Sequence, residues 1–272
     1  MIDKIVIFGT NGMLGNYIYK YFKNIDYNII AINRDKYEIT VDNISKIDDI
    51  FKEYDINKNT CVINCIGLIP QRNSREVYNY YIINSIFPQM LSKLCYKYNT
   101  KLIIPTTDCV FSGYRGNYTE DDIHDETNTY GISKSLGEPG YGTIIRTSII
   151  GEEKHNKYSF LEWIKNSKGE INCWNNHLWN GITCLQYCKI IQKIIDNDLF
   201  WNGIRHIYSP DIKSKYDMAI IIKDVYNLDI EINKSNTINN IDKTLSSIYS
   251  TNMLFDIPDI PTQIKELKDF CV

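Results

Sequence analysis

The chain has 272 residues and a formal net charge of −3 at pH 7, so it is long enough to bury a sizeable core. No run of like charges marks it as a partner for nucleic acid or for an anionic membrane surface. A strand-like run follows directly on the first residues and no apolar stretch is long enough to cross a bilayer, so we expect a cytoplasmic protein without a signal peptide. Its 8 cysteines lack CxxC spacing, which argues against a zinc site or a disulfide framework. The expected partner is a small soluble ligand.

The first half of the sequence alternates short β-branched runs with longer amphipathic patterns, which is typical of βαβ units. The predicted strands are residues 4–8, 28–32, 61–64, 101–105 and 143–146. The predicted helices between them are residues 13–23, 44–54, 76–98 and 130–138. This order predicts an α/β fold with a doubly wound parallel sheet of the Rossmann type.

The pattern loosens after Arg146, where a smaller α/β domain is expected to begin. A polar stretch at 151–157 precedes a predicted helix at 160–168 and a strand at 171–174. A helix at 183–196 and a strand at 204–208 follow, and we expect this segment, 183–208, to return to the first sheet. The tail from Lys213 is predicted to hold a helix, a strand at 229–233 and a Pro-punctuated end.

A glycine-rich turn joins the first predicted strand to the first helix. It reads Gly9, Thr10, Asn11, Gly12, Met13, Leu14 and Gly15. Glycines in this context allow a tight turn and a close approach to a pyrophosphate at the start of a helix. An ordinary strand-to-helix turn also uses glycines, but the complete strand, turn and helix favour a dinucleotide site.

The end of the second predicted strand indicates which dinucleotide is bound. NAD sites commonly place a carboxylate here for the ribose hydroxyls, whereas this chain has Arg34, which suits the 2′-phosphate of NADPH. Asp35 beside it leaves NADH as an alternative cofactor. Arg34 is alternatively a solvated loop residue without a role in binding. Asp42, after the next strand-like segment, is a candidate contact to the adenine.

Tyr130 and Lys134 form a YxxxK pair, whose spacing places both side chains on one face of a helix. An unperturbed tyrosine has a pKa of about 10, and a neighbouring ammonium stabilises the phenolate and lowers that pKa. The preceding predicted strand runs into Thr107, whose hydroxyl would polarise a substrate carbonyl while Tyr130 delivers a proton. Lys134 would also bond the nicotinamide ribose.

Longer motifs surround these residues: Thr-Thr-Asp-x-Val-Phe-x-Gly from Thr106, Tyr-Thr-Glu-Asp-Asp from Tyr118, Tyr-Gly-x-Ser-Lys-x-x-Gly-Glu from Tyr130, and Ile-Arg-Thr-Ser from Ile145. They resemble the dTDP-4-dehydrorhamnose reductase family of extended short-chain dehydrogenases/reductases, closely over residues 1–150 and loosely beyond. The resemblance implies an NADP-binding Rossmann domain at 1–150 and a sugar-nucleotide substrate domain at 151–272. It also implies reduction of the C4 ketone of a UDP- or dTDP-linked 4-keto-6-deoxy sugar in a rhamnose-type pathway.

The resemblance assigns further residues to the site. Cys65, Ile66 and Gly67 take the place of a family segment beside the cofactor, and Asn84 falls on a helix asparagine near the site. Reductases of this type often form homodimers, although the sequence leaves the oligomeric state open. In the second domain the candidates for base stacking and polar contacts, or equally for an aromatic core, are Trp174, Asn175, Trp179 and Asn180.

Cys109 occupies a position where simple 4-keto reductases usually carry a tyrosine and sugar-nucleotide dehydratases a glutamate. A cysteine here resembles the epimerase-reductases, in which the thiol shuttles a proton at the carbon beside the ketone, and this implies C3 epimerisation before reduction. A small apolar filler is the equal alternative. His155, Lys157 and His177 are the candidate partner acids.

A different class of function remains open at this point. The β subunit of methionine adenosyltransferase resembles the same reductase family, binds a dinucleotide and assists a partner without catalysing a reduction. The intact set of Thr107, Tyr130 and Lys134 favours an enzyme.

Overall fold

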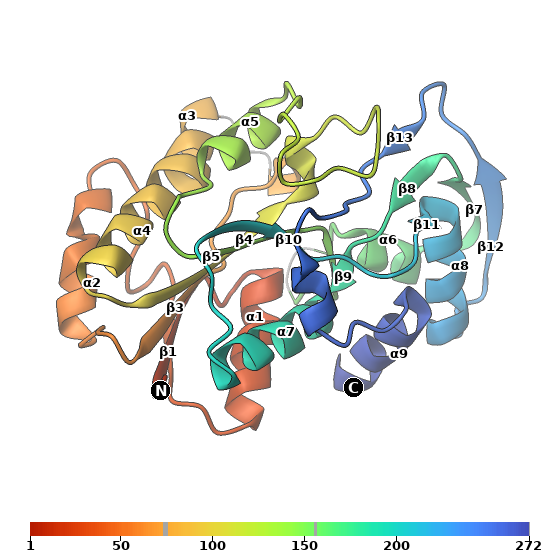
Figure 1. Ribbon diagram of the computed structural model, residues 1–272. Coiled ribbons are helices and arrows are strands. Elements are labelled where there is room, and N and C mark those ends of the chain that lie inside the picture. The colour runs from red at the N-terminus through yellow and green to blue at the C-terminus, as the bar shows by residue number, and fades with distance from the viewer. Residues whose placement is uncertain (73–75, 155–156, 272) are drawn as a thin grey trace. The chain divides into compact units, whose positions relative to one another are not determined.

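The computed structural model describes residues 1–72, 76–154 and 157–271 (Figure 1). The chain forms two compact units. The first contains Met1–Val110, Glu126–Arg146 and Cys188–Arg205, and the second contains Phe111–Asp125, Thr147–Tyr187 and His206–Val272. The chain therefore crosses between the units several times, and the cofactor and substrate roles expected for its two parts stay predictions.

A six-stranded sheet forms the centre of the first unit, in the order β10-β5-β4-β3-β1-β2. Its strands are β1 (Lys4–Phe8), β2 (Ile29–Ile32), β3 (Thr60–Asn64), β4 (Lys101–Thr107), β5 (Thr143–Thr147) and β10 (Gly203–His206). The β1–β2, β1–β3 and β3–β4 pairs are parallel, and Val6 aligns with both Ile30 and Val62. Chain order reverses beside β1, where doubly wound sheets bind ligands at the carboxyl ends of their strands. The predicted fold class is confirmed.

Helices cover both faces of this sheet because its strands are apolar on both sides. The helices are α1 (Met13–Asn24), α2 (Ile47–Glu53), α3 (Val77–Tyr81), α4 (Phe87–Lys97), α5 (Thr129–Leu136) and α7 (Cys184–Asp196). On one face Val6, Val62 and Leu102 share a buried core with Phe51 of α2 and Leu91 of α4. Figure 1 shows α1 and α7 side by side, and a tyrosine of α1, Tyr21, donates a hydrogen bond to Gln192 of α7.

Short turns of other helix types connect these elements. They are the 3-10 turns η1 (Ile44–Lys46), η2 (Pro70–Arg72) and η4 (Asp108–Val110), and the π-helix η3 (Ile82–Ile86). The sequence predicted one helix over 76–98, but η3 interrupts it between α3 and α4. An inserted π turn is common near functional sites, and this one contains Asn84.

The second unit contains three small sheets. Strand β7 (Gly169–Trp174) pairs in parallel with β12 (Ile230–Ser235), β8 (His177–Trp179) lies between β11 (Lys213–Ser214) and β13 (Ile241–Asp242), and β6 (Ile149–Ile150) pairs with β9 (Ile182–Thr183). Its helices are α6 (Phe160–Asn166), α8 (Lys215–Tyr226), α9 (Ile260–Cys271) and the 3-10 helix η5 (Ser250–Leu254). Sequence analysis gave the Pro-punctuated end no helix, yet α9 forms there. Pro261 is compatible with it because it lies in the first turn, where no backbone N–H is needed.

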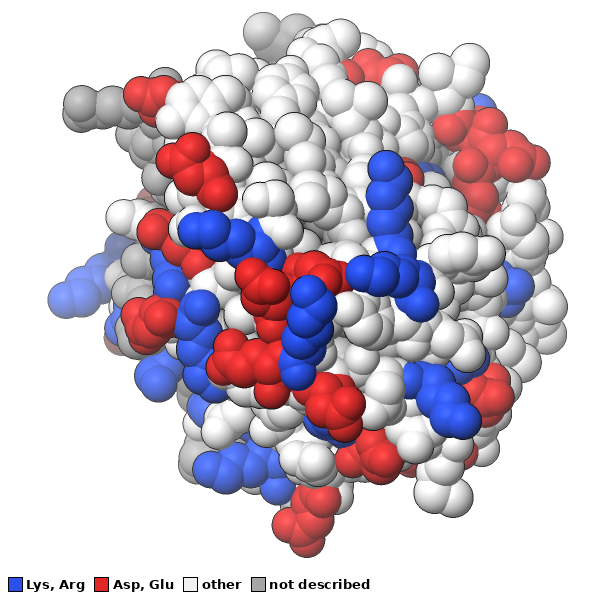
Figure 2. All heavy atoms as spheres, turned by 90° about the vertical axis from the view of Figure 1, so that its left-hand side faces the viewer, with Lys and Arg blue, Asp and Glu red and all other residues white. Residues whose placement is uncertain are grey.

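Charges of both signs are interspersed on the face of the first unit that includes α2 (Figure 2). Asp48 of α2 accepts from Lys52 at 2.7 Å and from Lys97 of α4 at 2.9 Å, and these contacts lower the pKa of the Asp48 carboxyl. Exposed pairs of this kind add little stability. In the described parts of the chain, no helix combines the length and the apolar character needed to span a bilayer.

The end of α5 packs so closely on η3 that it tolerates no side chain at Gly137. A Cβ there would lie 1.7 Å from the backbone oxygen of Asn84. We expect Gly137→Ala to reduce the free energy of unfolding by about 2 kcal/mol or more, because backbone must move to admit the methyl group. Gly140→Ala is the matched control, since a Cβ at Gly140 meets nothing within 4 Å. Urea denaturation measures both; equal stabilities of the two variants would contradict this account of the packing.

Candidate active site

The glycine turn lies between β1 and α1, at the carboxyl edge of the sheet. Gly9 has a φ of +86°, and a Cβ at Gly15 would lie 2.2 Å from the oxygen of Gly9, so the turn itself requires both glycines. Gly12 caps α1 without a side-chain acceptor for the first helical amides. A Cβ at Gly12 would come no closer than 3.4 Å to its neighbours, so packing within the protein does not require a glycine there. The missing side chain instead leaves room for a ligand to approach the backbone. These features fit an anionic pyrophosphate at the start of α1.

The other residues of the turn have different surroundings. Asn11 is exposed, Met13 is half-buried and Leu14 is buried, which leaves Leu14 its backbone for a ligand. Thr10 is buried and donates to Asn33 Oδ1 at 2.7 Å. Sequence analysis missed Asn33, whose place directly after β2 was the available signal. This bond fixes the chain just before Arg34.

Arg34 and Asp42 are both exposed. Arg34 follows the anchored Asn33, so its guanidinium starts from a fixed backbone beside the glycine turn. Asp42 lies farther along, in the turn before η1. The cofactor contacts expected of both residues stay predictions.

The segment after β3 lies against the glycine turn. Cys65 donates its backbone N–H to Phe8 O at 2.9 Å, and a Cβ on Gly9 would lie 2.8 Å from Ile66 Cγ1. Gly67 is exposed, and a Cβ built on it would lie 3.7 Å from Asn84 Oδ1. The structure therefore brings the predicted segment from Cys65 to Gly67 to the edge at which the dinucleotide is expected.

Asn84 uses its whole side-chain amide within the protein. Its oxygen accepts from Leu68 N at 2.8 Å, and its nitrogen donates to Leu68 O at 2.9 Å and to Ser133 Oγ at 3.0 Å. Both amide hydrogens are thus engaged. The π turn aims Asn84 so that it holds the loop after β3 against α5, and the residue acts on the site by positioning these two segments.

Thr107, Cys109, Tyr130 and Lys134 come together where β4 ends and α5 begins. Asn128 caps α5 by accepting from Gly131 N at 2.8 Å, and a Cβ on Gly131 would lie 2.6 Å from Cys109 O. This close contact lays α5 on η4, where the Thr107 hydroxyl donates to Asp108 Oδ1 at 3.1 Å and acts on the pKa of Tyr130. Thr107 Oγ1 also accepts from Cys109 N at 3.1 Å.

Burial dominates the electrostatics of this cluster. Desolvation raises the pKa of Tyr130 well above its usual value; Cys109 raises it further, and the hydroxyl of Thr107 opposes the shift. Desolvation likewise lowers the pKa of Lys134. The sequence predicted a lowered pKa for the phenol, and that expectation was wrong because burying the phenolate is costly and the nearby Cys109 and Asp108 also disfavour it.

The candidates in the second unit have unequal surroundings. Trp174 is 47% exposed and its ring lies 4.4 Å from that of His177. Trp179 and Asn180 are buried, and Asn180 exchanges hydrogen bonds of 2.8 and 2.9 Å with the backbone of Leu245. Asn175 donates its backbone N–H to Ser235 O. The structure therefore leaves Trp174 exposed, while Trp179 and Asn180 support the unit's core.

Of the three candidate partner acids of Cys109, Lys157 and His177 belong to the second unit. Lys157 is exposed, and His177 Nε2 lies 2.8 Å from Thr237 Oγ1. His155 lies outside the described residues.

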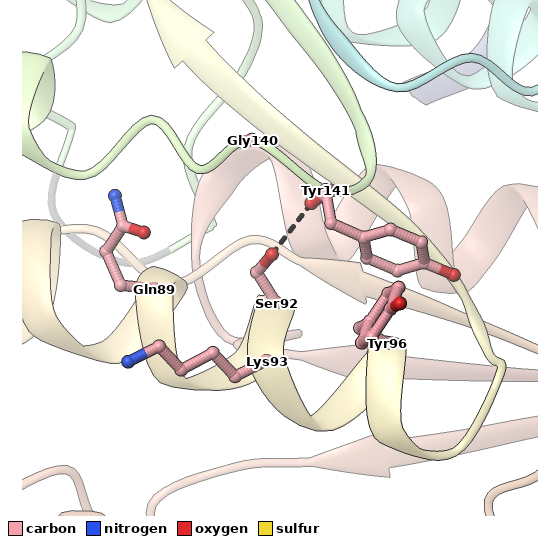
Figure 3. Close-up of a pocket in the computed structure, with 6 residues that line it drawn as sticks. All are labelled: Gln89, Ser92, Lys93, Tyr96, Gly140 and Tyr141. Carbon is pink, nitrogen blue, oxygen red and sulfur yellow. Dashed lines mark hydrogen bonds between the residues drawn. The ribbon is translucent and has the colours of Figure 1, made fainter.

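A surface pocket in the first unit contains none of the predicted site residues (Figure 3). Its lining is Gln89, Ser92, Lys93, Tyr96, Gly140 and Tyr141, and Ser92 donates to Tyr141 O at 2.8 Å across it. This bond joins α4 to the segment after α5, so the pocket is a product of their packing.

The RmlD substrate binding domain family matches residues 3–251. The chain belongs to this family. A dTDP-4-dehydrorhamnose reductase of Aggregatibacter actinomycetemcomitans is 27% identical over 81% of this chain and 78% of its own length. Methionine adenosyltransferase 2 subunit beta of Danio rerio is 23% identical over 83% and 74%. The crystal structure of a Bacillus anthracis dTDP-4-dehydrorhamnose reductase in complex with NADP is 22% identical and covers 99% of this chain and all of its own, with a TM-score of 0.81. The family predicted from the sequence motifs is confirmed.

Proposed function

We propose that this chain reduces the C4 ketone of a dTDP-linked 4-keto-6-deoxy sugar with NADPH. The supporting observation is the cluster of Thr107, Tyr130 and Lys134 in the same unit as a glycine turn suited to a pyrophosphate. The choice of a dTDP-linked sugar rests on the similarity to the Aggregatibacter dTDP-4-dehydrorhamnose reductase. The choice of NADPH rests on the similarity to the Bacillus reductase structure that contains NADP. A UDP-linked sugar and a homodimer remain predictions from the sequence.

NADPH, when bound, supplies the hydride that reduces the carbonyl carbon. Thr107 holds the carbonyl oxygen by a hydrogen bond and Tyr130 transfers its hydroxyl proton to that oxygen. The raised pKa of Tyr130 suits this direction, because the buried phenol keeps its proton at neutral pH and yields it to a more basic alkoxide. The ammonium of Lys134 then stabilises the phenolate that is left.

The purified chain should oxidise NADPH when supplied with a dTDP-linked 4-keto-6-deoxy sugar. Tyr130→Phe keeps the ring but removes the proton donor, so we expect kcat/KM to fall by about 10²–10⁴-fold while NADPH binding is retained. Stopped-flow absorbance measures the first quantity and fluorescence titration the second. The UDP-linked sugar is the parallel substrate. If the wild-type chain oxidises NADPH with neither sugar, the reductase proposal fails and a regulatory role like that of the adenosyltransferase β subunit is favoured.

Arg34 is proposed to bind the 2′-phosphate of NADPH. Its replacement by alanine removes a charge-assisted hydrogen bond, so the KM for NADPH should rise by about 10–100-fold. The KM for NADH, which lacks this phosphate, should barely change and serves as the internal control. A parallel rise for both cofactors would show that Arg34 does not distinguish them.

Cys109 is proposed to epimerise the carbon beside the ketone before reduction. Its thiol lies 3.6 Å from Asp108 Oδ1 and raises the pKa of Tyr130. It is therefore near the phenol that is proposed to protonate the carbonyl oxygen. The ketone acidifies the neighbouring C–H bond; a base removes that proton, and an acid returns one to the opposite face.

Cys109→Ser should abolish deuterium exchange from D₂O at this carbon while direct reduction of a pre-epimerised ketone continues. Mass spectrometry of the recovered sugar measures the exchange. Exchange at the wild-type rate in the serine variant would assign Cys109 to packing alone.

A further inference from the structure

The carboxylate of Glu138 is buried two residues beyond the end of α5. Its side chain is 4% exposed and that of its ion-pair partner Arg146 is 0% exposed. Arg146 donates from Nη2 to Oε2 at 2.6 Å and from Nε to Oε1 at 3.2 Å, and Thr106 donates to Oε1 at 2.8 Å. Such a two-point contact fixes the orientation of the carboxylate as well as its position.

The three partners belong to different elements around the active site. Thr106 precedes Thr107 in β4, Arg146 is in β5, and Glu138 continues the segment that carries Tyr130 and Lys134. Gln89 of α4 donates to the backbone oxygen of Glu138 at 3.3 Å. The carboxylate therefore ties the helix with the phenol and the ammonium to the strand with the hydroxyl.

Glu138 also affects the charge of Lys134. The titratable groups acting on Lys134 are Glu138, Cys109 and Cys65, each of which favours the ammonium, while the opposing effect of burial is larger and lowers the pKa of Lys134. Glu138 has the strongest favourable influence of the three. Burial raises the pKa of Cys65 to about 12, so this thiol is uncharged near neutral pH.

Four further side chains act on the pKa of Tyr130. Cys109, Asp108 and Tyr80 raise it, and the hydroxyl of Thr107 lowers it. Arg146 is a further buried charge and is paired with Glu138, the carboxylate that favours the ammonium of Lys134.

We propose that Glu138 is a positioning residue, which fixes α5 against β4 and provides the buried negative charge that keeps Lys134 an ammonium beside Tyr130. This inference rests on the proposed reductase function, in which Lys134 works in its charged form. It gives the Gly-Glu end of the Tyr-Gly-x-Ser-Lys-x-x-Gly-Glu motif a role in the chemistry of the site.

The test must separate the charge of Glu138 from its packing. Glu138→Gln alone leaves Arg146 as an unpaired buried cation, which strongly destabilises a fold. The double variant Glu138→Gln, Arg146→Met removes both charges at similar volume, an exchange that proteins commonly tolerate. Glu138→Asp is the conservative variant, since it retains the charge.

The decisive measurement is the pKa of Lys134 in each protein, obtained from the ¹³Cε shifts of ¹³C-lysine-labelled chain, with Lys134→Arg assigning the resonance. Loss of the Glu138 carboxylate should lower this pKa in the double variant, even where its melting temperature matches the wild type. Because the ammonium is then lost at lower pH, the alkaline limb of the kcat/KM profile should move toward neutral pH by a similar amount. Glu138→Asp should restore part of both shifts.

Glu162→Gln is the matched control. Glu162 is also a buried carboxylate, in α6 of the second unit, where it accepts from Glu153 N at 3.2 Å and Asn166 Nδ2 at 3.4 Å. This substitution should reduce stability and leave the titration of Lys134 unchanged.

A wild-type Lys134 titration in the folded double variant would overturn the inference and reduce Glu138 to a packing residue. The titration needs no substrate, so it decides the role of Glu138 even if the wild-type chain reduces no sugar ketone. A shifted Lys134 in a chain without reductase activity would support the electrostatic role and reject the proposed function alone.

Discussion

The candidate active site buries a phenol and an amine that are carried by the same helix, α5. Desolvation raises the pKa of Tyr130 and lowers that of Lys134, so it favours the uncharged form of each. Reduction of a ketone needs the neutral phenol, which burial supplies, and the charged lysine, which burial opposes. The surrounding structure must therefore supply negative charge to Lys134.

The packing around α5 meets this requirement. The helix lies on η4 through Gly131 and on η3 through Gly137, two positions at which a Cβ would collide with backbone. Asn84 joins the same helix to the loop beside the glycine turn. Just beyond the end of this helix, Glu138 then binds Arg146 and favours the ammonium of Lys134. Close backbone contacts thus set the geometry, and one buried carboxylate adjusts the charge.

Much of the fold could be predicted from the sequence, because the strands are continuous β-branched runs and the glycine turn sits between a strand and a helix. The set of Thr107, Tyr130 and Lys134 was predicted from spacing and position; the structure brings these residues together, and their catalytic role stays a prediction. The π turn at Asn84 was not, since one extra residue in a helix barely changes its periodicity. The contacts of Glu138 were hidden as well, because they join residues of different elements that only folding brings together. The direction of the Tyr130 pKa depends on burial, which no motif encodes.

The central claim is that Thr107, Tyr130 and Lys134 direct a hydride to a sugar carbonyl. Deuterium transfer tests it most directly: the chain is incubated with NADPH deuterated at the transferring position and a dTDP-linked 4-keto-6-deoxy sugar, and NMR reads the label at C4 of the product. We expect one deuterium at C4 from the wild-type chain, and none from a Thr107→Val, Tyr130→Phe variant that still binds NADPH. An unlabelled C4 in the wild-type product, or full labelling by the variant, would contradict the account.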